Sequence, residues 1–258
     1  MSYMIQKRAP TSGNSLRTVL SDGTYSQIRE LLLSHQIAPG ERVNIDALAR
    51  ELDVSQTPVR ESLARLEADG LVAKEPLRGY KATDLLTVAQ VQDLFQFREL
   101  IEPWAAMKAA RSIDEQGHQR IRQELLTGKS AEKLGIDEAY PAMSKHDARF
   151  HALIAELSRS EFVRDAYIHT HCHLHLFRLY KVQKTWLDES QADAIGVREL
   201  FDLYYNPSSG FLALREHERI AEAVIGGDEV RASSLMLEHI ENSLSRFTPT
   251  ISNPEPNQ

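Results

Sequence analysis

The sequence predicts a mainly α-helical protein of two domains, a small N-terminal domain that ends in a β-hairpin and a larger all-α antiparallel bundle. Apolar residues recur at helical spacing along most of the chain. One pair of short segments around a turn, near Pro76 to Gly79, has the pattern of a hairpin, and no convincing strand pattern follows it. At 258 residues, the chain is long enough for two domains that each bury a core.

The segment from Asn44 onward predicts two short helices joined by a tight turn. Asn44 stands where an N-cap is expected, and Ser55 can cap the second helix, with Pro58 tolerated in its first turn. The first helix carries an apolar stripe of Ile45, Leu48, Ala49 and Leu52. The stripe of the second helix is Val59, Leu63 and Leu66. An earlier helix is expected from about Thr24 to Gln36.

A hairpin is expected directly after the second helix. Gly70 can end that helix in the left-handed conformation, and the segments at 71–73 and 80–82 flank a turn at 76–79. Helix, turn, helix and hairpin in this order make a winged helix-turn-helix. Its ordinary use is to place the second helix in the major groove of DNA.

Polar residues near the start of the second helix and at the hairpin tip are the candidates for DNA contact. Thr57, Arg60 and Ser62 are expected to face outward, and arginines suit both base edges and phosphates. The expected DNA-binding residues are Ser55, Gln56, Thr57, Arg60, Arg65, Arg78 and Gly79. The alternative is a packing motif whose arginines are only solvated.

The distribution of charge predicts a dimer. The net charge is −7, but residues 1–85 hold 11 basic and 11 acidic residues, so the excess lies in the remainder. A neutral DNA-binding domain releases few counterions, and we therefore expect a homodimer on double-stranded, two-fold symmetric operator DNA. The single cysteine, Cys172, excludes an internal disulfide and fits the cytoplasm. No apolar run approaches membrane-spanning length, and no signal peptide is visible.

The segment VSQTPVRESLARLEADGLV resembles the DNA-binding signature of the GntR regulators, over roughly residues 20 to 85. In that family an arginine usually stands where this chain has Gln56. A glutamine amide can read adenine, so the difference bears on the operator sequence rather than on DNA binding.

The second domain is predicted to be an antiparallel bundle of about six or seven helices. The helices are expected at about 87–111, 114–127, 137–158, 161–184, 189–204, 210–225 and 228–247. The domain boundaries are a mobile segment at 1–20, the winged domain at 21–85, the bundle at 86–247 and a disordered tail at 248–258.

One carboxylate and three imidazoles are expected to point into this bundle. Asp147 and His151 lie four residues apart and share a helix face, while His217 and His239 lie on apolar stripes of two other helices. Bundles build metal sites in this way, and the set suits zinc first, with nickel, manganese or iron as alternatives. A single inward histidine is more often a core residue bonded to a carbonyl.

The bundle also resembles the FCD effector domain of FadR-like GntR regulators. The matching pieces are FRELIEPWAA, Asp147-x3-His151, His217 in EHERIAEAV and His239 in MLEHI. The resemblance implies that these four side chains hold a divalent metal and that a small carboxylate effector occupies its open positions. It also implies that Arg98 faces the cavity and pairs with the effector. The alternative for Arg98 is an ion pair with Glu102 within its helix.

The histidine-rich segment HTHCHLHLF, residues 169–177, is interpreted as part of one long helix rather than a strand. On a helix His171, His175 and Arg178 share one face, and we expect His171 and His175 to line the effector cavity. The alternative is a histidine-rich packing surface.

The sequence therefore predicts a transcriptional regulator, a repressor of a small catabolic operon, controlled by a carboxylate that binds at the metal. Two other hypotheses remain open: a metalloenzyme with an attached DNA-binding domain, and a sensor for which the metal ion is itself the signal. We find no carboxylate clearly placed as a general base, so we predict that the protein is not an enzyme.

Overall fold

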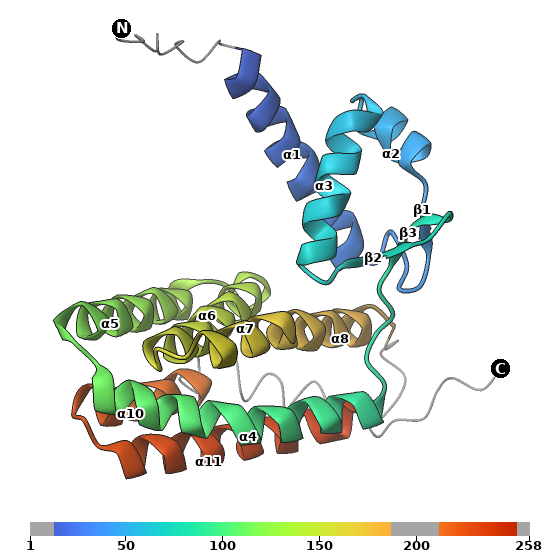
Figure 1. Cartoon of the computed structure of the whole chain (residues 1–258). Helices are drawn as coiled ribbons and strands as arrows, with labels where there is room; N and C mark the ends of the chain where they lie inside the picture. The colour runs from blue at the N-terminus through green and yellow to red at the C-terminus, as the bar shows by residue number, and fades with distance from the viewer. Residues whose placement is uncertain (1–12, 187–211, 252–258) are drawn as a thin grey trace, which may run out of the picture. The chain divides into compact units, whose positions relative to one another are not determined.

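A computed structural model describes residues 13–186 and 212–251 of the chain (Figure 1). The chain divides into two compact units between Leu85 and Leu86, and each unit is described by itself. The mainly helical fold with a small N-terminal sheet is the predicted one. No helix in the described part is both long and apolar enough to cross a membrane.

The described residues of the first unit, 13–85, form three helices and three short strands. Its elements are α1 (Gly13–Leu33), β1 (Arg42–Val43), α2 (Ile45–Glu51), α3 (Gln56–Ala68), β2 (Val72–Glu75) and β3 (Gly79–Ala82). α1 begins at Gly13 rather than at Thr24, and the mobility expected for residues 1–20 stays a prediction. Leu16, Val19 and Leu20 recur at helical spacing and were the available signal for this extension. Residues 1–12 lie outside the described part.

Local hydrogen bonds explain where α2 and α3 begin and end. The Asn44 side chain accepts a bond from the amide of Ala47, as an N-cap should. Ser55 takes the N-cap position of α3 but makes no side-chain cap bond. After α3, Gly70 has φ of 73°, so the expected left-handed glycine ends the helix.

The three strands form an antiparallel sheet in the order β1-β3-β2. The expected hairpin is β2 and β3, with Val72 opposite Ala82 and Glu75 opposite Gly79. β1 was missed, because two residues are too few to show an alternating pattern. At the tip, Leu77 has φ of 61° and is fully exposed, and Gly79 has φ of 88°.

The core of the first unit lies between α1, α3 and the sheet. Its fully buried members are Ile28, Val59, Leu63, Leu66, Leu71 and Ala82. Ser62 also belongs to this interior: it is completely buried, and its hydroxyl donates to the Ser21 carbonyl at 3.3 Å. The expectation that Ser62 faces outward is therefore wrong.

The second unit is all helical in its described residues. Its elements are α4 (Val88–Ser112), α5 (Glu115–Ser130), the short 3-10 helix η1 (Ala131–Lys133), α6 (Ile136–Leu157), α7 (Glu161–His169), α8 (Cys172–Trp186), α10 (Leu212–Ile225) and α11 (Glu229–Ile251). α11 lies alongside α4 (Figure 1). The helix expected at 189–204 lies outside the described residues. α11 continues to Ile251, so the expected tail begins too early.

The helix expected at 161–184 is two helices. The Thr170 hydroxyl donates to the Tyr167 carbonyl at 2.7 Å, and His171 has φ of 46°, which ends α7. The Cys172 amide then donates to the Thr170 hydroxyl at 3.3 Å at the start of α8. The apolar pattern runs through this break and gave no sign of it.

Other helix ends follow the expected caps. Thr87 forms a capping box with Gln90 at the start of α4. Asp228 accepts a bond from the amide of Arg231, directly after Gly227 with φ of 71°. The core between these helices includes Val91, Phe95, Phe150, Ile154, Ile220, Val224, Met236 and Ile240.

Candidate functional site

Three buried imidazoles from three helices converge in the second unit. His151 comes from α6, His217 from α10 and His239 from α11, and a ligand atom from each lies within 4.8 Å of the others. The Nε2 atoms of His151 and His239 are 3.1 Å apart, and those of His217 and His239 are 3.3 Å apart. Each ring therefore turns the same nitrogen toward a common centre.

The opposite nitrogens of two rings face carboxylates. His151 Nδ1 is bonded to Glu102 of α4, and His239 Nδ1 lies 2.7 Å from Glu216 of α10. An ionised carboxylate can only accept a hydrogen bond, so each Nδ1 carries the proton. The Nε2 atoms of His151 and His239 are consequently bare lone pairs.

His217 reaches a carboxylate indirectly, through a fourth imidazole. Its Nδ1 lies 3.0 Å from His146 Nε2, and His146 Nδ1 lies 2.8 Å from Glu124. Burial would raise the pKa of Glu124, but hydrogen bonds from His146 and Arg149 outweigh it and lower that pKa. Glu124 is therefore ionised and accepts the His146 Nδ1 proton, so in a neutral His146 ring Nε2 accepts the proton of His217.

The electrostatics of the centre favour the neutral form of two of these rings, His151 and His217. Burial lowers the pKa of His151 to about 4, although Glu102 opposes the shift. Burial, with the neighbouring imidazoles of His239 and His151, holds the pKa of His217 well below its usual value. For Glu102 burial favours the neutral form, but Arg98 and His151 prevail and hold its pKa well below normal.

This donor set fits a divalent cation. Three lone pairs that face one another repel unless a cation lies between them, and neutral imidazole is the form that binds metals. A metal about 2.0–2.1 Å from each nitrogen would separate neighbouring ligand atoms by about 2.9–3.4 Å. The spacings of 3.1 and 3.3 Å lie in that range. Carboxylates on the far nitrogens are the usual outer partners of metal-bound histidines.

Asp147, the fourth expected ligand, lies at the side of this group. Its carboxylate is nearly buried, and Oδ1 is 3.9 Å from His217 Nδ1. It groups with His146 and His217 rather than with all three converging imidazoles. The structure thus brings together three of the four expected side chains and leaves the carboxylate next to one of them.

The sequence interpretation missed the partners that orient the rings. These are Glu124, His146 and Glu216, together with the role of Glu102 toward His151. His146 precedes Asp147 directly, and adjacent helical residues project about 100° apart, so the shared-face argument passed over it. The one available signal was its spacing of four from Phe150, which places it on an apolar face.

Arg98 of α4 is buried and pairs with Glu102, one turn along the same helix. The alternative considered for it, an ion pair within the helix, is thus present. Its Nη1 is nevertheless buried without a hydrogen-bond partner among the described residues. Glu102 contacts both Arg98 and His151, so Glu102 links the Arg98 guanidinium to the imidazole group.

His173 of α8, which was not among the residues expected at the effector cavity, makes a ring contact with the imidazole group. The His173 and His151 ring centroids are 5.0 Å apart, and His173 Nε2 is buried without a partner among the described residues. Burial and the charge of Arg98 hold the pKa of His173 well below its usual value. The break at His171 starts a new helix, and the expected place of His171 and His175 at the effector cavity stays a prediction.

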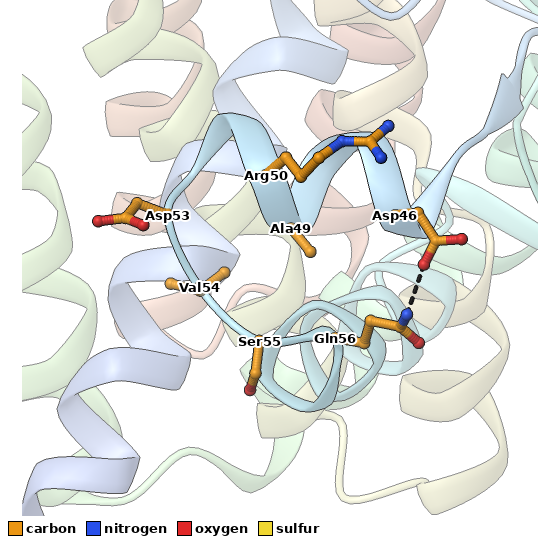
Figure 2. Close-up of a pocket in the computed structure, with 7 residues that line it drawn as sticks. All are labelled: Asp46, Ala49, Arg50, Asp53, Val54, Ser55 and Gln56. Carbon is orange, nitrogen blue, oxygen red and sulfur yellow. Dashed lines mark hydrogen bonds between the residues drawn. The ribbon is translucent and has the colours of Figure 1, made fainter.

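The exposed start of α3 carries the candidate DNA contacts. Ser55, Gln56, Thr57 and Arg60 are exposed. An open groove of about 590 Å³ lies beside them, lined by Asp46, Ala49, Arg50, Asp53, Val54, Ser55 and Gln56 (Figure 2). The Gln56 amide donates to Asp46 of α2, as Figure 2 shows, and its oxygen accepts from Arg60 at 3.4 Å.

Arg65, also expected on this face, has partners within the first unit. It pairs with Asp22 at 2.7 Å and lies 4.2 Å from the centre of the Tyr25 ring. These contacts join α3 to α1. Arg78 and Gly79 are exposed at the hairpin tip, as expected.

Comparisons with known proteins agree on one family. The family model of the FCD domain matches residues 93–242. The family model of the bacterial regulatory proteins of the gntR family matches residues 20–81. The HTH-type transcriptional regulator LutR of Bacillus subtilis is 28% identical, over 82% of this chain and 94% of its own. The Uxu operon transcriptional regulator of Escherichia coli is 26% identical, over 86% and 84%.

Solved structures share the fold. Escherichia coli McbR/YncC matches with a TM-score of 0.61 and 16% identity, over 88% of this chain and 95% of its own. A GntR regulator from Rhodococcus sp. RHA1 matches with a TM-score of 0.58 and 19% identity, over 91% and 99%. The chain belongs to the GntR family, as a transcriptional regulator with an FCD domain and not an enzyme.

Proposed function

We propose that this regulator is a cytoplasmic repressor of a small catabolic operon, and that a carboxylate metabolite bound at a metal in the FCD domain controls its operator affinity. The observation that carries the proposal is the convergence of the Nε2 lone pairs of His151, His217 and His239. Their far nitrogens are all occupied by partners that fix this orientation.

The metal would be held by the three imidazoles, with Asp147 as the nearest carboxylate. Zinc suits this donor set best, and nickel, manganese or iron are alternatives. When bound, the ion supplies a localised positive charge that attracts a carboxylate. With three or four protein ligands, the coordination of such metals leaves room for an exogenous oxygen.

Arg98 and His173 are the side chains of this chain that best suit the effector. The free Nη1 of Arg98 is a charged donor, and a guanidinium matches a carboxylate geometrically. His173 Nε2 adds a second unsatisfied nitrogen near His151. Burial without partners is costly for such groups, and a bound anion or hydroxyl would remove that cost.

Effector binding would act on operator affinity through the helices that carry the ligands. α6, α10 and α11 each contribute one imidazole, so a change at the metal bears on three helices together. A coupling free energy of about 1–3 kcal/mol would change operator affinity roughly 5- to 150-fold. In a dimer, a change in the spacing of two DNA-binding domains weakens both contacts at once.

Double-stranded operator DNA would meet α3 in the major groove and the hairpin tip at the backbone or minor groove. Thr57 and Arg60 are the leading contacts, with Ser55 and Gln56 beside them. Arg78 and Gly79 would contact DNA from the wing. Arg65 would reach a phosphate only by leaving Asp22, so we rank it below Arg60.

An exposed apolar face of α4 supports a homodimer. Leu100 and Trp104 lie one turn apart, and 78% and 40% of their surfaces are exposed. Large apolar residues at helical spacing on a surface are typical of an interface. A two-fold dimer would present two copies of α3 to the two halves of an operator.

Replacing His217 by alanine should lower metal affinity more than roughly 100-fold, because a ligand itself is lost. Loss of a residue that only hydrogen-bonds a ligand typically costs about 10- to 100-fold. The measurement is elemental analysis of dialysed protein, with His118→Ala as a matched control, because that residue lies apart from the imidazole group. Full metal occupancy in His217→Ala would remove this residue from the ligand set.

With metal held constant, small hydroxy- and keto-carboxylates should release operator DNA in a fluorescence anisotropy titration. In His173→Gln the concentration for half release should rise roughly tenfold or more, as loss of a 1.4 kcal/mol contact would produce. His169→Gln, at an exposed histidine of α7, serves as the control. Release driven by metal alone would instead identify a metal sensor.

Replacing Arg60 by alanine should weaken operator binding while metal content stays unchanged. If Arg60 contacts a phosphate, the slope of log affinity against log salt should shrink by about 0.9. Arg122→Ala, an exposed residue of the other unit, is the control. Unchanged operator affinity in Arg60→Ala would show that the wrong face of α3 has been chosen.

Replacing Leu100 by glutamate should dissociate the dimer, because the charge would be desolvated at the interface. Sedimentation velocity of the full chain reports the mass directly. The same change at Leu126 of α5, which is 61% exposed, should leave the dimer intact. A Leu100→Glu protein that remains dimeric would exclude this face of α4 as the interface.

A further inference from the structure

We propose that Glu124 and His146 form an outer-shell arm that fixes the tautomer and orientation of His217, and that Gly128 provides the space for it. The inference rests on the proposed metal site, since His217 is one of its ligands. It assigns to these three residues a positioning role.

The arm is a continuous chain of hydrogen bonds that begins near the surface. Arg149 Nε donates to Glu124 at 2.9 Å, Glu124 accepts from His146 Nδ1, and His146 Nε2 accepts from His217 Nδ1. His146 and His217 are both completely buried, whereas 46% of the Arg149 side chain is exposed. The ionised carboxylate gives the chain its direction, because it can only accept.

The arm decides which nitrogen of His217 faces the metal centre. A neutral imidazole carries its proton on one nitrogen and its lone pair on the other. While His146 accepts from Nδ1, the lone pair of His217 must lie on Nε2, next to His239. The His217 ring also stacks on Phe150, with centroids 4.1 Å apart, which fixes its plane.

Gly128 makes this position of His146 possible. A Cβ atom built on Gly128 would lie 2.8 Å from His146 Nδ1 and Cε1 and 2.9 Å from its Cγ. Such distances are shorter than van der Waals contact, so any side chain at residue 128 would displace the ring. Glu124 and Gly128 lie four residues apart on α5 and share a face. The helix α5 therefore contacts the His146 ring twice. Glu124 binds its Nδ1 atom, and Gly128 packs against the ring.

The arm differs from the supports of the other two imidazoles. His151 and His239 bond directly to Glu102 and Glu216. His217 bonds to another imidazole, His146, and only His146 bonds to the carboxylate of Glu124. Loss of His146 therefore removes the hydrogen-bond acceptor that His217 Nδ1 has among the described residues, and Asp147 Oδ1 at 3.9 Å is too far to replace it without movement.

The test compares His146→Phe with His146→Gln in the full chain. Phenylalanine fills the space but cannot accept the His217 proton, so zinc affinity should fall roughly 10- to 100-fold in competition with a chromophoric chelator. Glutamine can accept from His217 and donate to Glu124, and its affinity should stay within about threefold of the parent. The visible spectrum of the cobalt-substituted protein should change in His146→Phe and recover in His146→Gln.

Two glycine variants separate the packing effect from general loss of stability. Gly128→Ala should weaken zinc binding as His146→Phe does. Gly135→Ala is the control, because nothing lies within 4 Å of a Cβ at that residue. Unchanged zinc affinity in both His146→Phe and Gly128→Ala would overturn the proposal.

Further outcomes distinguish the arm from its rivals. If the parent binds two zinc ions per chain and His146→Phe binds one, His146 is a ligand and the positioning role is wrong. If the parent binds no divalent metal, the proposed metal site fails. In that case imidazole nitrogen shifts of the metal-free protein still decide the tautomer of His217, and an Nδ1 lone pair in the parent would overturn the arm.

Discussion

The second unit depends on one electrostatic constraint, the approach of three buried imidazole rings that turn their Nε2 atoms toward one another. With Nε2 atoms 3.1 and 3.3 Å apart, two facing lone pairs repel unless a proton or a metal ion lies between them. The arrangement persists because each Nδ1 is tied to a partner on another residue, so no ring can turn without breaking a buried hydrogen bond. These hydrogen bonds link α4 to α6 and α10 to α11. They also link α5 to α6 and α6 to α10.

A buried ion pair strengthens this constraint. Glu102 accepts from His151 and is paired with Arg98, and both residues are almost completely buried. A buried pair is costly to break, because the remaining charge has no partner. The carboxylate that orients His151 is thereby held ionised by the Arg98 guanidinium, whose Nη1 has no hydrogen-bond partner among the described residues. Under the proposed function, Glu102 would support both the metal ligand His151 and the effector contact Arg98.

The sequence predicted the parts of the fold that follow from local periodicity. The winged unit, the caps at Asn44 and Thr87 and the turn glycine at Gly70 all depend on residues close in the chain. The convergence of His151, His217 and His239 was accessible because each lies on an apolar helix face. Contacts between helices were not: Glu124 and Glu216 look like any of the 37 acidic residues until the helices are packed. The break before α8, made by Thr170 and His171, was likewise not visible in the apolar pattern.

In the first unit, the departure at Gln56 has a local compensation. Its amide donates to Asp46 and its oxygen accepts from Arg60, so two contacts within the unit orient the side chain. In the proposed complex with DNA, this ordering would lower the entropy that a contact between the Gln56 amide and a base costs. The Asp46 carboxylate lies beside the groove and accepts a hydrogen bond from the Gln56 amide, which is itself uncharged (Figure 2).

The contact between Gly128 and His146 has a consequence for how this domain tolerates sequence change. Every genetic substitution of glycine adds a side chain, so residue 128 has no conservative replacement while the ring stays where it is. A residue without any functional group is thus under the same restriction as a ligand. Drift at this position in a lineage would require a simultaneous change at His146, which makes the two residues a linked pair in the evolution of the site.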